Sequence, residues 1–393
     1  TRQIHYQGAT IYWQYQGPQT APEIDLVSLM YPSLERLVEF AETPGEQRPL
    51  IMCEYAHSMG NSCGNLKEYW DLVAAYKRLQ GGFVWDWVDQ GLRQRTETGE
   101  TWFAYGGDFG DEPNDGPFCL NGLLFPDWQA KPALWEYKKV LEPVRVAAID
   151  LAEGWIEVAN AYPFSDLSGL EIHWRVVADD EVLDQGILEP LYTPPGERER
   201  VRVPYAMPEP RPETDYWLHV SFRLVEDCAW AGKGHEVAWA QFPLPAQVLA
   251  GPKLKRSDLP ALRVDTSERV IAVQGEDFTA AFDRGSGRLA ALEYKGEQLI
   301  RQGPRLNVWR APTHNDEGQT WSRKFASEWR QAGFDGLVER LRDFSFRSLA
   351  PQVVCVSVET GLATEAGEGR FECTYTYTLY GNGEMAIAAR VVP

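Results

Sequence analysis

Residues 49–62 read PLIMCEYAHSMGNS, an apolar run that leads directly into a carboxylate, an aromatic residue, a histidine and a glycine turn. A short apolar run of this kind predicts a buried parallel strand. Glu54 then lies at the carboxyl end of that strand, where α/β folds place their reactive groups. Glutamate is rarely buried without a partner or a purpose, so Glu54 is either a functional carboxylate or the ion-pair partner of a nearby arginine.

The segments around this run alternate between apolar strand patterns and amphipathic helix patterns. The predicted strands are 24–31, 49–54 and 83–88, and the predicted helices are 33–42, 66–80 and 130–141. Gly81 and Gly82 are interpreted as the stop of the second helix. Strand–helix repeats of this length predict a parallel sheet with right-handed crossovers. Because functional side chains follow each strand, we expect residues 1–143 to be the carboxyl-terminal part of a (β/α)₈ barrel.

Beyond this region the helical patterns disappear and apolar and polar residues alternate between Gly, Pro and Asp turns. Residues 144–250 are predicted to form an immunoglobulin-like β-sandwich. A proline-punctuated linker is expected over 243–260. Residues 251–393 keep strand patterning to the last residue and are predicted to be the amino-terminal part of a large β-sandwich.

Composition narrows the class of protein. The formal charge of −19 argues against nucleic acid and against an anionic membrane surface as partners. No apolar stretch is long enough for a spanning helix. The six cysteines form no C-x-x-C pair, and we interpret them as reduced thiols of a cytoplasmic protein.

Few residues near Glu54 lie in a short motif that identifies a catalytic or metal-binding side chain. Glycosidases use two carboxylates, but the acids in the following loops, from Asp86 to Asp115, are better interpreted as turn and cap residues. His57 could bind a substrate hydroxyl or cap a turn, and neither alternative is favoured. No two histidines have the spacing of a helical zinc site. No G-x-S-x-G elbow marks a nucleophilic serine.

Longer motifs make the sequence recognisable. They read CEYAHSMGN at 53–61, QGGFVWDWVDQ at 80–90, YGGDFGD at 105–111, FCLNG at 118–122 and WRAPTHND at 309–316. In this order they resemble the large bacterial β-galactosidases of glycoside hydrolase family 2, and the resemblance covers essentially the whole chain. That family hydrolyses terminal β-D-galactosides with retention, through a covalent glycosyl–enzyme intermediate.

The resemblance implies roles for individual residues. Glu54 is the expected nucleophile, and Tyr31 is expected to donate a hydrogen bond close to it. Further side chains are expected to contact the sugar: Met30 lines the site, His57 binds hydroxyls, Trp85 forms the floor of the pocket, and Asn121 contacts the sugar or its ion. A sodium site is expected to use the backbone oxygen of Phe118 and the side chain of Asn121. The family also binds magnesium and is commonly oligomeric.

Some family features are missing from the sequence. The family's acid/base glutamate follows an asparagine, and no Asn-Glu pair occurs in this chain. The residues that match the magnesium ligands are also absent. General acid assistance contributes roughly 10² to 10⁴ in rate. We therefore expect this chain to be inactive, or nearly so, by itself.

Two alternatives stay open on the sequence. One is another specificity of the same family, β-glucuronidase or β-mannosidase. No Lys or Arg stands beside Glu54 or Asn121 to pair with a substrate carboxylate, which disfavours a glucuronidase. The other is a non-catalytic scaffold or carbohydrate-binding protein in which Glu54 is structural.

Overall fold

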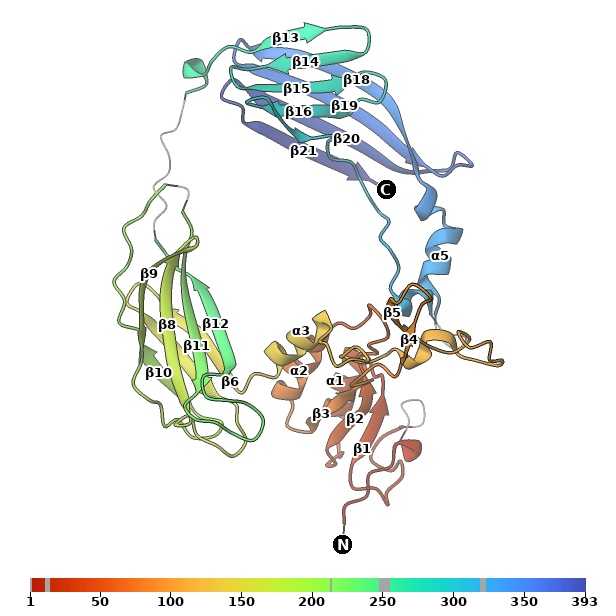
Figure 1. The fold of residues 1–393 in the computed structure, drawn as a ribbon, viewed down its shortest axis with the longest axis vertical. Coiled ribbons are helices and arrows are strands. Elements are labelled where there is room, and N and C mark those ends of the chain that lie inside the picture. Colours follow the sequence, from red (N-terminus) through yellow and green to blue (C-terminus); the bar gives the residue numbers. More distant parts are fainter. Residues whose placement is uncertain (1, 11–14, 213, 247–254, 319–322) are drawn as a thin grey trace. The chain divides into compact units, whose positions relative to one another are not determined.

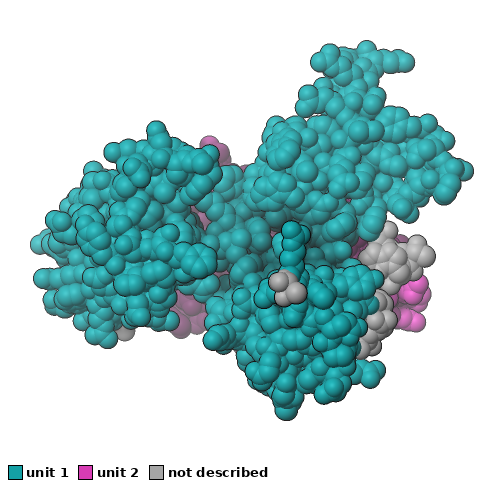
Figure 2. Space-filling model, turned by 90° about the horizontal axis from the view of Figure 1, so that it is seen from below, with its two compact units in different colours: residues 1–251 teal, residues 252–393 magenta. Residues whose placement is uncertain are grey.

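The computed structural model describes residues 2–10, 15–212, 214–246, 255–318 and 323–393. They fall into two units, Thr1–Gly251 and Pro252–Pro393, coloured separately in Figure 2. The expected linker over 243–260 lies partly outside the described residues. Within the described ranges, no helix is both long and apolar enough to cross a membrane.

The first sheet of the chain has three parallel strands in the order β1-β2-β3 (Figure 1). The strands are β1 (Val27–Met30), β2 (Leu50–Tyr55) and β3 (Leu79–Val84), connected by helices α1 (Leu34–Glu42) and α2 (Leu66–Ala75). Fully buried side chains of these elements form one apolar core. The predicted parallel sheet with helical crossovers is therefore present.

Helix α1 has both ends satisfied by side chains. At its start the Ser33 hydroxyl accepts a hydrogen bond from the Arg36 amide, as an N-cap does. Beyond its last turn the Arg78 guanidinium donates to the carbonyl oxygens of Phe40, at 3.0 Å, and Glu46, at 2.6 Å. Arg78 therefore joins the end of the helix to the segment that leads into β3.

The predicted boundary between the second helix and the third strand is wrong. Helix α2 ends at Ala75 rather than residue 80, and β3 runs over 79–84 rather than 83–88. Gly81 and Gly82 are strand residues, not a helix stop. A Cβ on Gly82 would come within 2.6 Å of the Met52 Cβ, so glycine allows β2 and β3 to approach.

The chain after β3 forms loops and one further helix. A short antiparallel ribbon of β4 (Leu92–Arg95) and β5 (Thr101–Ala104) is followed by a 3₁₀ turn, η2 (Gly116–Cys119). Helix α3 (Pro132–Val140) occupies the region predicted over 130–141, with Pro132 in its first turn.

The next strands form two antiparallel sheets that enclose a second core (Figure 1). One sheet has the order β10-β7-β6 and the other β12-β11-β8-β9. The strands are β6 (Val144–Asp150), β7 (Trp155–Asn160), β8 (Leu170–Ala178), β9 (Glu181–Ile187), β10 (Arg198–Arg202), β11 (Tyr216–Leu224) and β12 (Glu236–Pro243). A turn over 151–154 separates β6 from β7.

Two residues at the end of α3, Lys139 in its last turn and Glu142 just after it, bind the backbone of strand β12. The Lys139 ammonium lies 4.0 Å from the centre of the Trp239 ring and donates to the Trp239 carbonyl oxygen. Glu142 accepts from Lys139 at 2.6 Å and from the Trp239 amide at 3.3 Å. Burial raises the pKa of the Glu142 carboxyl, with Lys139 opposing that rise.

The second unit is built from two antiparallel sheets around a third core. One is β13-β14-β15-β16-β17 and the other β18-β19-β20-β21. The strands are β13 (Arg263–Thr266), β14 (Val270–Gln274), β15 (Phe278–Asp283), β16 (Leu289–Tyr294), β17 (Glu297–Ile300), β18 (Val338–Ala350), β19 (Val353–Ala363), β20 (Gly369–Tyr380) and β21 (Met385–Val392). A turn over 284–286 joins β15 to β16. Short helices α4 (His314–Glu317) and α5 (Phe325–Gln331) precede β18.

The first unit contains a largely buried ion pair between Glu46 and Arg48, and substitution of Glu46 tests how much this pair stabilises the fold. Burial alone would raise the pKa of the Glu46 carboxyl, but hydrogen bonds from Arg48 and Tyr15 lower it to about 2. Because the folded pKa lies below the ordinary value, the stabilisation is complete above about pH 4.5 and is lost as the pH falls toward 2. Glu46→Gln is expected to cost about 3 kcal/mol at pH 7, since it leaves Arg48 without its partner.

Urea denaturation at pH 7 and at pH 3 measures this cost. The difference between wild type and Glu46→Gln should shrink at the lower pH. As a control, Glu39→Gln removes the more exposed partner of Arg36 and should change stability by less than about 1 kcal/mol. Equal losses for both variants would contradict the assignment.

Candidate active site

The carboxyl ends of β1 and β2 bring Glu54 and Tyr31 together. Glu54 is the second-last residue of β2 and pairs in register with Met30, the last residue of β1. The Tyr31 amide donates to the Glu54 carbonyl oxygen at 2.8 Å, and the Tyr31 phenol is close enough to the Glu54 carboxylate for that charge to act on its pKa. All three side chains are partly exposed, so the pair is within reach of a ligand.

The environment of Tyr31 keeps its phenol protonated. Burial, followed by the negative charge of Glu54, raises the pKa of Tyr31 well above its usual range. The phenol can therefore donate a hydrogen bond, and the Glu54 carboxylate can accept one. Tyr31 and Ala56, each just past the strand it follows, have positive φ angles of 45° and 51°. Non-glycine residues in this region are strained, and such residues cluster at functional sites.

His57 and Trp85 extend the site to the loops after β2 and β3. The His57 ring lies edge-on to the Tyr31 ring, with centroids 6.0 Å apart, and 5.9 Å from the Phe118 ring. The Trp85 carbonyl oxygen accepts from the Ser58 amide at 2.8 Å, which fixes the two loops side by side. Trp85 is 37% exposed, so part of this aromatic residue is open to solvent.

Asn121 lies at the bottom of this cluster with only 2% of its surface exposed. Its side-chain Nδ2 donates to the Phe118 carbonyl oxygen at 2.8 Å. Its Oδ1 is buried and has no hydrogen-bond partner among the described residues. Its own carbonyl oxygen accepts from the Asp86 amide, which joins the loop to the end of β3. The structure thus brings all the predicted site residues to one end of the sheet.

Sequence reasoning missed the residues that hold the Asn121 loop in place. Asp89 and Lys131 form an ion pair at 2.7 Å in which both side chains are 5% exposed. Asp89 also accepts from the Gly122 amide at 2.7 Å. A Cβ on Gly122 would lie 2.3 Å from the Val88 carbonyl carbon, so the loop packs directly on backbone. Lysine is almost never buried without a partner, so a buried lysine would have pointed to an anchoring ion pair. Nothing in the sequence around Lys131 indicates that its side chain is buried.

Three of the loop acids behave as the sequence predicts. Asp86 accepts from the Val88 amide, Asp108 from the Tyr105 amide and Asp111 from the Gly107 amide. These are turn-forming hydrogen bonds. Asp86 has a second effect, because its charge contributes to the raised pKa of Tyr31.

Comparison with known families agrees with this geometry. The model of the "Glycosyl hydrolases family 2, TIM barrel domain" matches residues 1–146, which carry the whole cluster. The chain belongs to glycoside hydrolase family 2. The models "Beta-galactosidase, domain 4" and "Beta galactosidase small chain" match residues 156–245 and 274–393. The predicted fold class, part of a barrel followed by β-sandwich regions, is confirmed.

Curated relatives extend the similarity over the chain. It is 39% identical to a β-galactosidase of Priestia megaterium over 396 aligned residues, which cover 100% of this chain and 36% of that protein. It is 34% identical to β-galactosidase 2 of Enterobacter cloacae, over 91% of this chain and 35% of that protein. The chain therefore spans about a third of the length of these relatives.

Similarity to solved structures is weaker. The Amycolatopsis orientalis exo-chitosanase CsxA aligns over 69% of this chain and 29% of its own, with 11% identity and a TM-score of 0.21. A β-glycosidase from Bacteroides vulgatus aligns over 94% of this chain and 45% of its own, with 11% identity and a TM-score of 0.22. TM-scores this low support no conclusion.

Substitutions in the Asp89–Lys131 ion pair test whether it anchors the Asn121 loop. Lys131→Met leaves the Asp89 carboxylate buried without its cation, and we expect a loss of about 3 to 5 kcal/mol in unfolding free energy. The double variant Asp89→Asn/Lys131→Met should recover part of that loss, because no uncompensated charge remains. Chemical denaturation of the three proteins measures both quantities.

The chain offers a matched control in an exposed ion pair. Lys67→Met removes the partner of Asp71 on the surface of α2 and should cost less than about 1 kcal/mol. If Lys131→Met were as mild as Lys67→Met, the Asp89–Lys131 pair would not anchor the Asn121 loop.

Proposed function

We propose that this chain carries the nucleophile half of a retaining β-galactosidase site, with Glu54 as the nucleophile. The juxtaposition of a protonated Tyr31 phenol and the Glu54 carboxylate at the carboxyl ends of β1 and β2 is the observation that best supports it. A carboxylate nucleophile must be ionised and held in one orientation, and a permanent phenol donor serves both needs. The similarity to β-galactosidases along the whole chain supports the choice of substrate.

The chemistry proceeds in two displacements. A Glu54 oxygen attacks the anomeric carbon while the bond to the leaving group breaks, and an acid protonates the departing oxygen. Water then attacks the same carbon, the acid group now acts as base, and the ester to Glu54 is cleaved with net retention. The Tyr31 phenol stays on the carboxylate throughout and stabilises the charge that returns to it in the second step.

The remaining side chains would bind the sugar. His57, packed between two aromatic rings, is fixed in orientation and can hydrogen-bond a hydroxyl. Trp85 offers an exposed ring on which the apolar face of a galactose could rest. Met30 borders the same position, since it pairs with Glu54 across the two strands.

The sodium ion expected for the family fits the residues around Asn121. The buried Asn121 Oδ1 lacks a partner among the described residues, and the Phe118 carbonyl oxygen lies within hydrogen-bond distance of the same side chain. Amide and carbonyl oxygens are ligands that hard cations prefer. When bound, the ion would present a positive charge to which the oxygen of a sugar hydroxyl could bind. For magnesium, the described residues contain no group of three His, Cys, Asp or Glu side chains that could hold a metal.

The cellular setting and partners are also proposals. Six free cysteines suit a reducing compartment, so we propose a cytoplasmic protein. Its partner would be a small β-galactoside, and the whole protein would be a homo-oligomer. Neither nucleic acid nor a membrane is a partner that the acidic composition favours.

Labelling tests the role of Glu54 directly. A 2-fluoro-β-galactoside with a dinitrophenyl leaving group needs no acid assistance, because that group departs without a proton. We expect mass spectrometry of the whole protein to find the sugar on the peptide that contains Glu54. The label should be absent from Glu54→Gln, whose turnover of an aryl β-D-galactoside should fall by at least about 10³-fold. A label on any other carboxylate would refute the assignment.

The chain by itself should hydrolyse that aryl galactoside at least about 10²-fold more slowly than the whole protein, because it lacks the general acid. Steady-state rates of the two proteins measure this difference. Turnover by the chain that disappears in Glu54→Gln would show that it supplies its own acid.

Removal of one phenol oxygen isolates the contribution of Tyr31. In the whole protein, Tyr31→Phe keeps the ring against His57 but removes the donor to Glu54, and kcat should fall by about 10²-fold. Tyr69→Phe is the matched control, since the Tyr69 hydroxyl donates to the Pro32 carbonyl oxygen at 2.7 Å instead. Both variants should lose about 1 kcal/mol of stability, and only Tyr31→Phe should lose activity.

A further inference from the structure

Residues 118–121 form a turn whose backbone is held by the loop that follows β3. The Gln90 amide donates to the Cys119 carbonyl oxygen at 2.9 Å. The Asp86 amide donates to the Asn121 carbonyl oxygen. The loop after β3 therefore fixes the turn at two points, and both contacts come from residues whose side chains are polar.

The side chains of the same two residues bind each other. The Gln90 Nε2 donates to Asp86 Oδ2 at 2.9 Å, and Asp86 Oδ1 accepts from the Val88 amide at 3.2 Å. Hydrogen bonds to an ionised carboxylate are stronger than those between neutral groups. Because both carboxylate oxygens are used inside this one loop, the side chains fix the separation of the Asp86 and Gln90 amides that hold the turn.

The two oxygens proposed to bind sodium belong to the first and last residues of this turn. They are the Phe118 carbonyl oxygen and the Asn121 Oδ1, and the Asn121 Nδ2 folds back to donate to that same carbonyl oxygen at 2.8 Å. The shape of the turn therefore sets how the two oxygens lie relative to each other. A ligand binds more weakly when part of its binding free energy is spent on ordering its site. A loosened turn should therefore bind the ion less tightly.

Two further contacts hold neighbouring positions of the backbone. The Gly60 amide donates to the Leu120 carbonyl oxygen at 2.8 Å, and Asp89 accepts from the amide of the residue that follows the turn. Asp89 is buried, whereas Gln90 is exposed. Loss of the bond between Asp86 and Gln90 should therefore loosen the turn without unfolding the region around it.

We propose that the hydrogen bond between the Asp86 and Gln90 side chains positions the 118–121 turn for sodium. Both are positioning residues, because they act through the backbone of the turn and not on the ion or the sugar. This inference rests on the proposed sodium site at Phe118 and Asn121. Weakening the bond should raise the sodium concentration that the whole protein needs, while the rate at saturating sodium stays close to that of wild type.

Hydrogen exchange of the whole protein tests the proposal, with mass spectrometry of the peptide that contains residues 118–121. Gln90→Met keeps the length of the side chain and removes its donor. With choline chloride in place of sodium chloride, we expect this peptide to exchange at least about 3-fold faster than in wild type, as for a local opening that has lost one hydrogen bond. The sodium concentrations for half of the full protection and for half-maximal hydrolysis of an aryl galactoside should rise at least about 3-fold, with kcat at saturating sodium within about 2-fold of wild type.

Two further variants serve as controls. Gln129→Met removes a similar bond in the next turn, where the exposed Gln129 side chain donates to Asp127 at 3.2 Å, and it should change neither quantity. Asp86→Asn should stay close to wild type in its sodium requirement. Its oxygen can still accept from Val88, and the Gln90 amide can reverse to accept from the new amide group. Asp86→Ala has no such acceptor and should behave like Gln90→Met.

The outcomes separate this inference from the sodium site on which it rests. Unchanged exchange in Gln90→Met would overturn the positioning role, and so would faster exchange with an unaltered sodium requirement. Asn121→Ala removes a proposed ligand and should abolish the response to sodium. If that response survives in Asn121→Ala, the sodium site is refuted and this inference with it. If it is lost in Asn121→Ala but unchanged in Gln90→Met, only the positioning role is refuted.

Discussion

The candidate site depends on one buried carboxylate. Asp89 accepts hydrogen bonds from the Lys131 ammonium and the Gly122 amide, so a single side chain joins the loop after β3, the Asn121 loop and the start of α3. Removing two charges from water is costly, and the cost is recovered only when both are paired. The hydrogen bond from Asp86 to the Asn121 carbonyl depends on this anchor. A carboxylate that never touches a ligand thus sets the position of residues proposed to do so.

Strand β2 could be predicted because burial on both faces produces a continuous apolar run. The end of that run located Glu54 at the edge of the sheet, and the neighbouring strand ends located Tyr31 and Trp85. The start of β3 could not be predicted, because two adjacent glycines signal a helix stop as readily as a close strand approach. Gly82 is a glycine for the second reason, and only the position of Met52 reveals it. The domain boundaries at 143/144 and 250/251 stay predictions.

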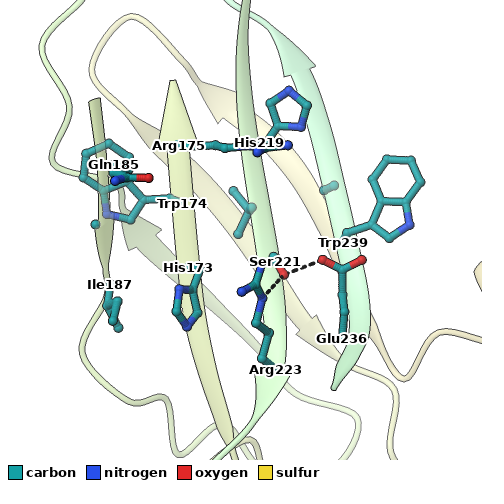
Figure 3. A pocket seen from close by; sticks show the side chains of 13 residues that line it. His173, Trp174, Arg175, Gln185, Ile187, His219, Ser221, Arg223, Glu236 and Trp239 are labelled. Atoms are coloured by element: carbon teal, nitrogen blue, oxygen red, sulfur yellow. Dashed lines mark hydrogen bonds between the residues drawn. The ribbon is translucent and has the colours of Figure 1, made fainter. Parts of the chain in front are cut away.

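Side-chain partners were the least predictable part of the site. The sequence shows several acids after β3 but does not show that Asp86 forms a turn while Asp89 is buried against a lysine 42 positions later. Likewise, alternation in β8 and β11 predicts which residues face outward, but not that the Ser221 hydroxyl links Arg223 to Glu236 (Figure 3). Motifs locate groups near the backbone elements that carry them, whereas long-range pairing depends on the assembled fold.

The contacts around Trp239 occupy backbone groups at an exposed edge of a sheet. Strand β12 is the outermost strand of its sheet, so one side of its backbone has no neighbouring strand. At Trp239 both outward-facing backbone groups are already occupied: the amide by Glu142 and the carbonyl oxygen by Lys139. An exposed edge with unpaired backbone groups is a template for intermolecular β-pairing. Two side chains from the helical region therefore block intermolecular β-pairing at this position of the edge.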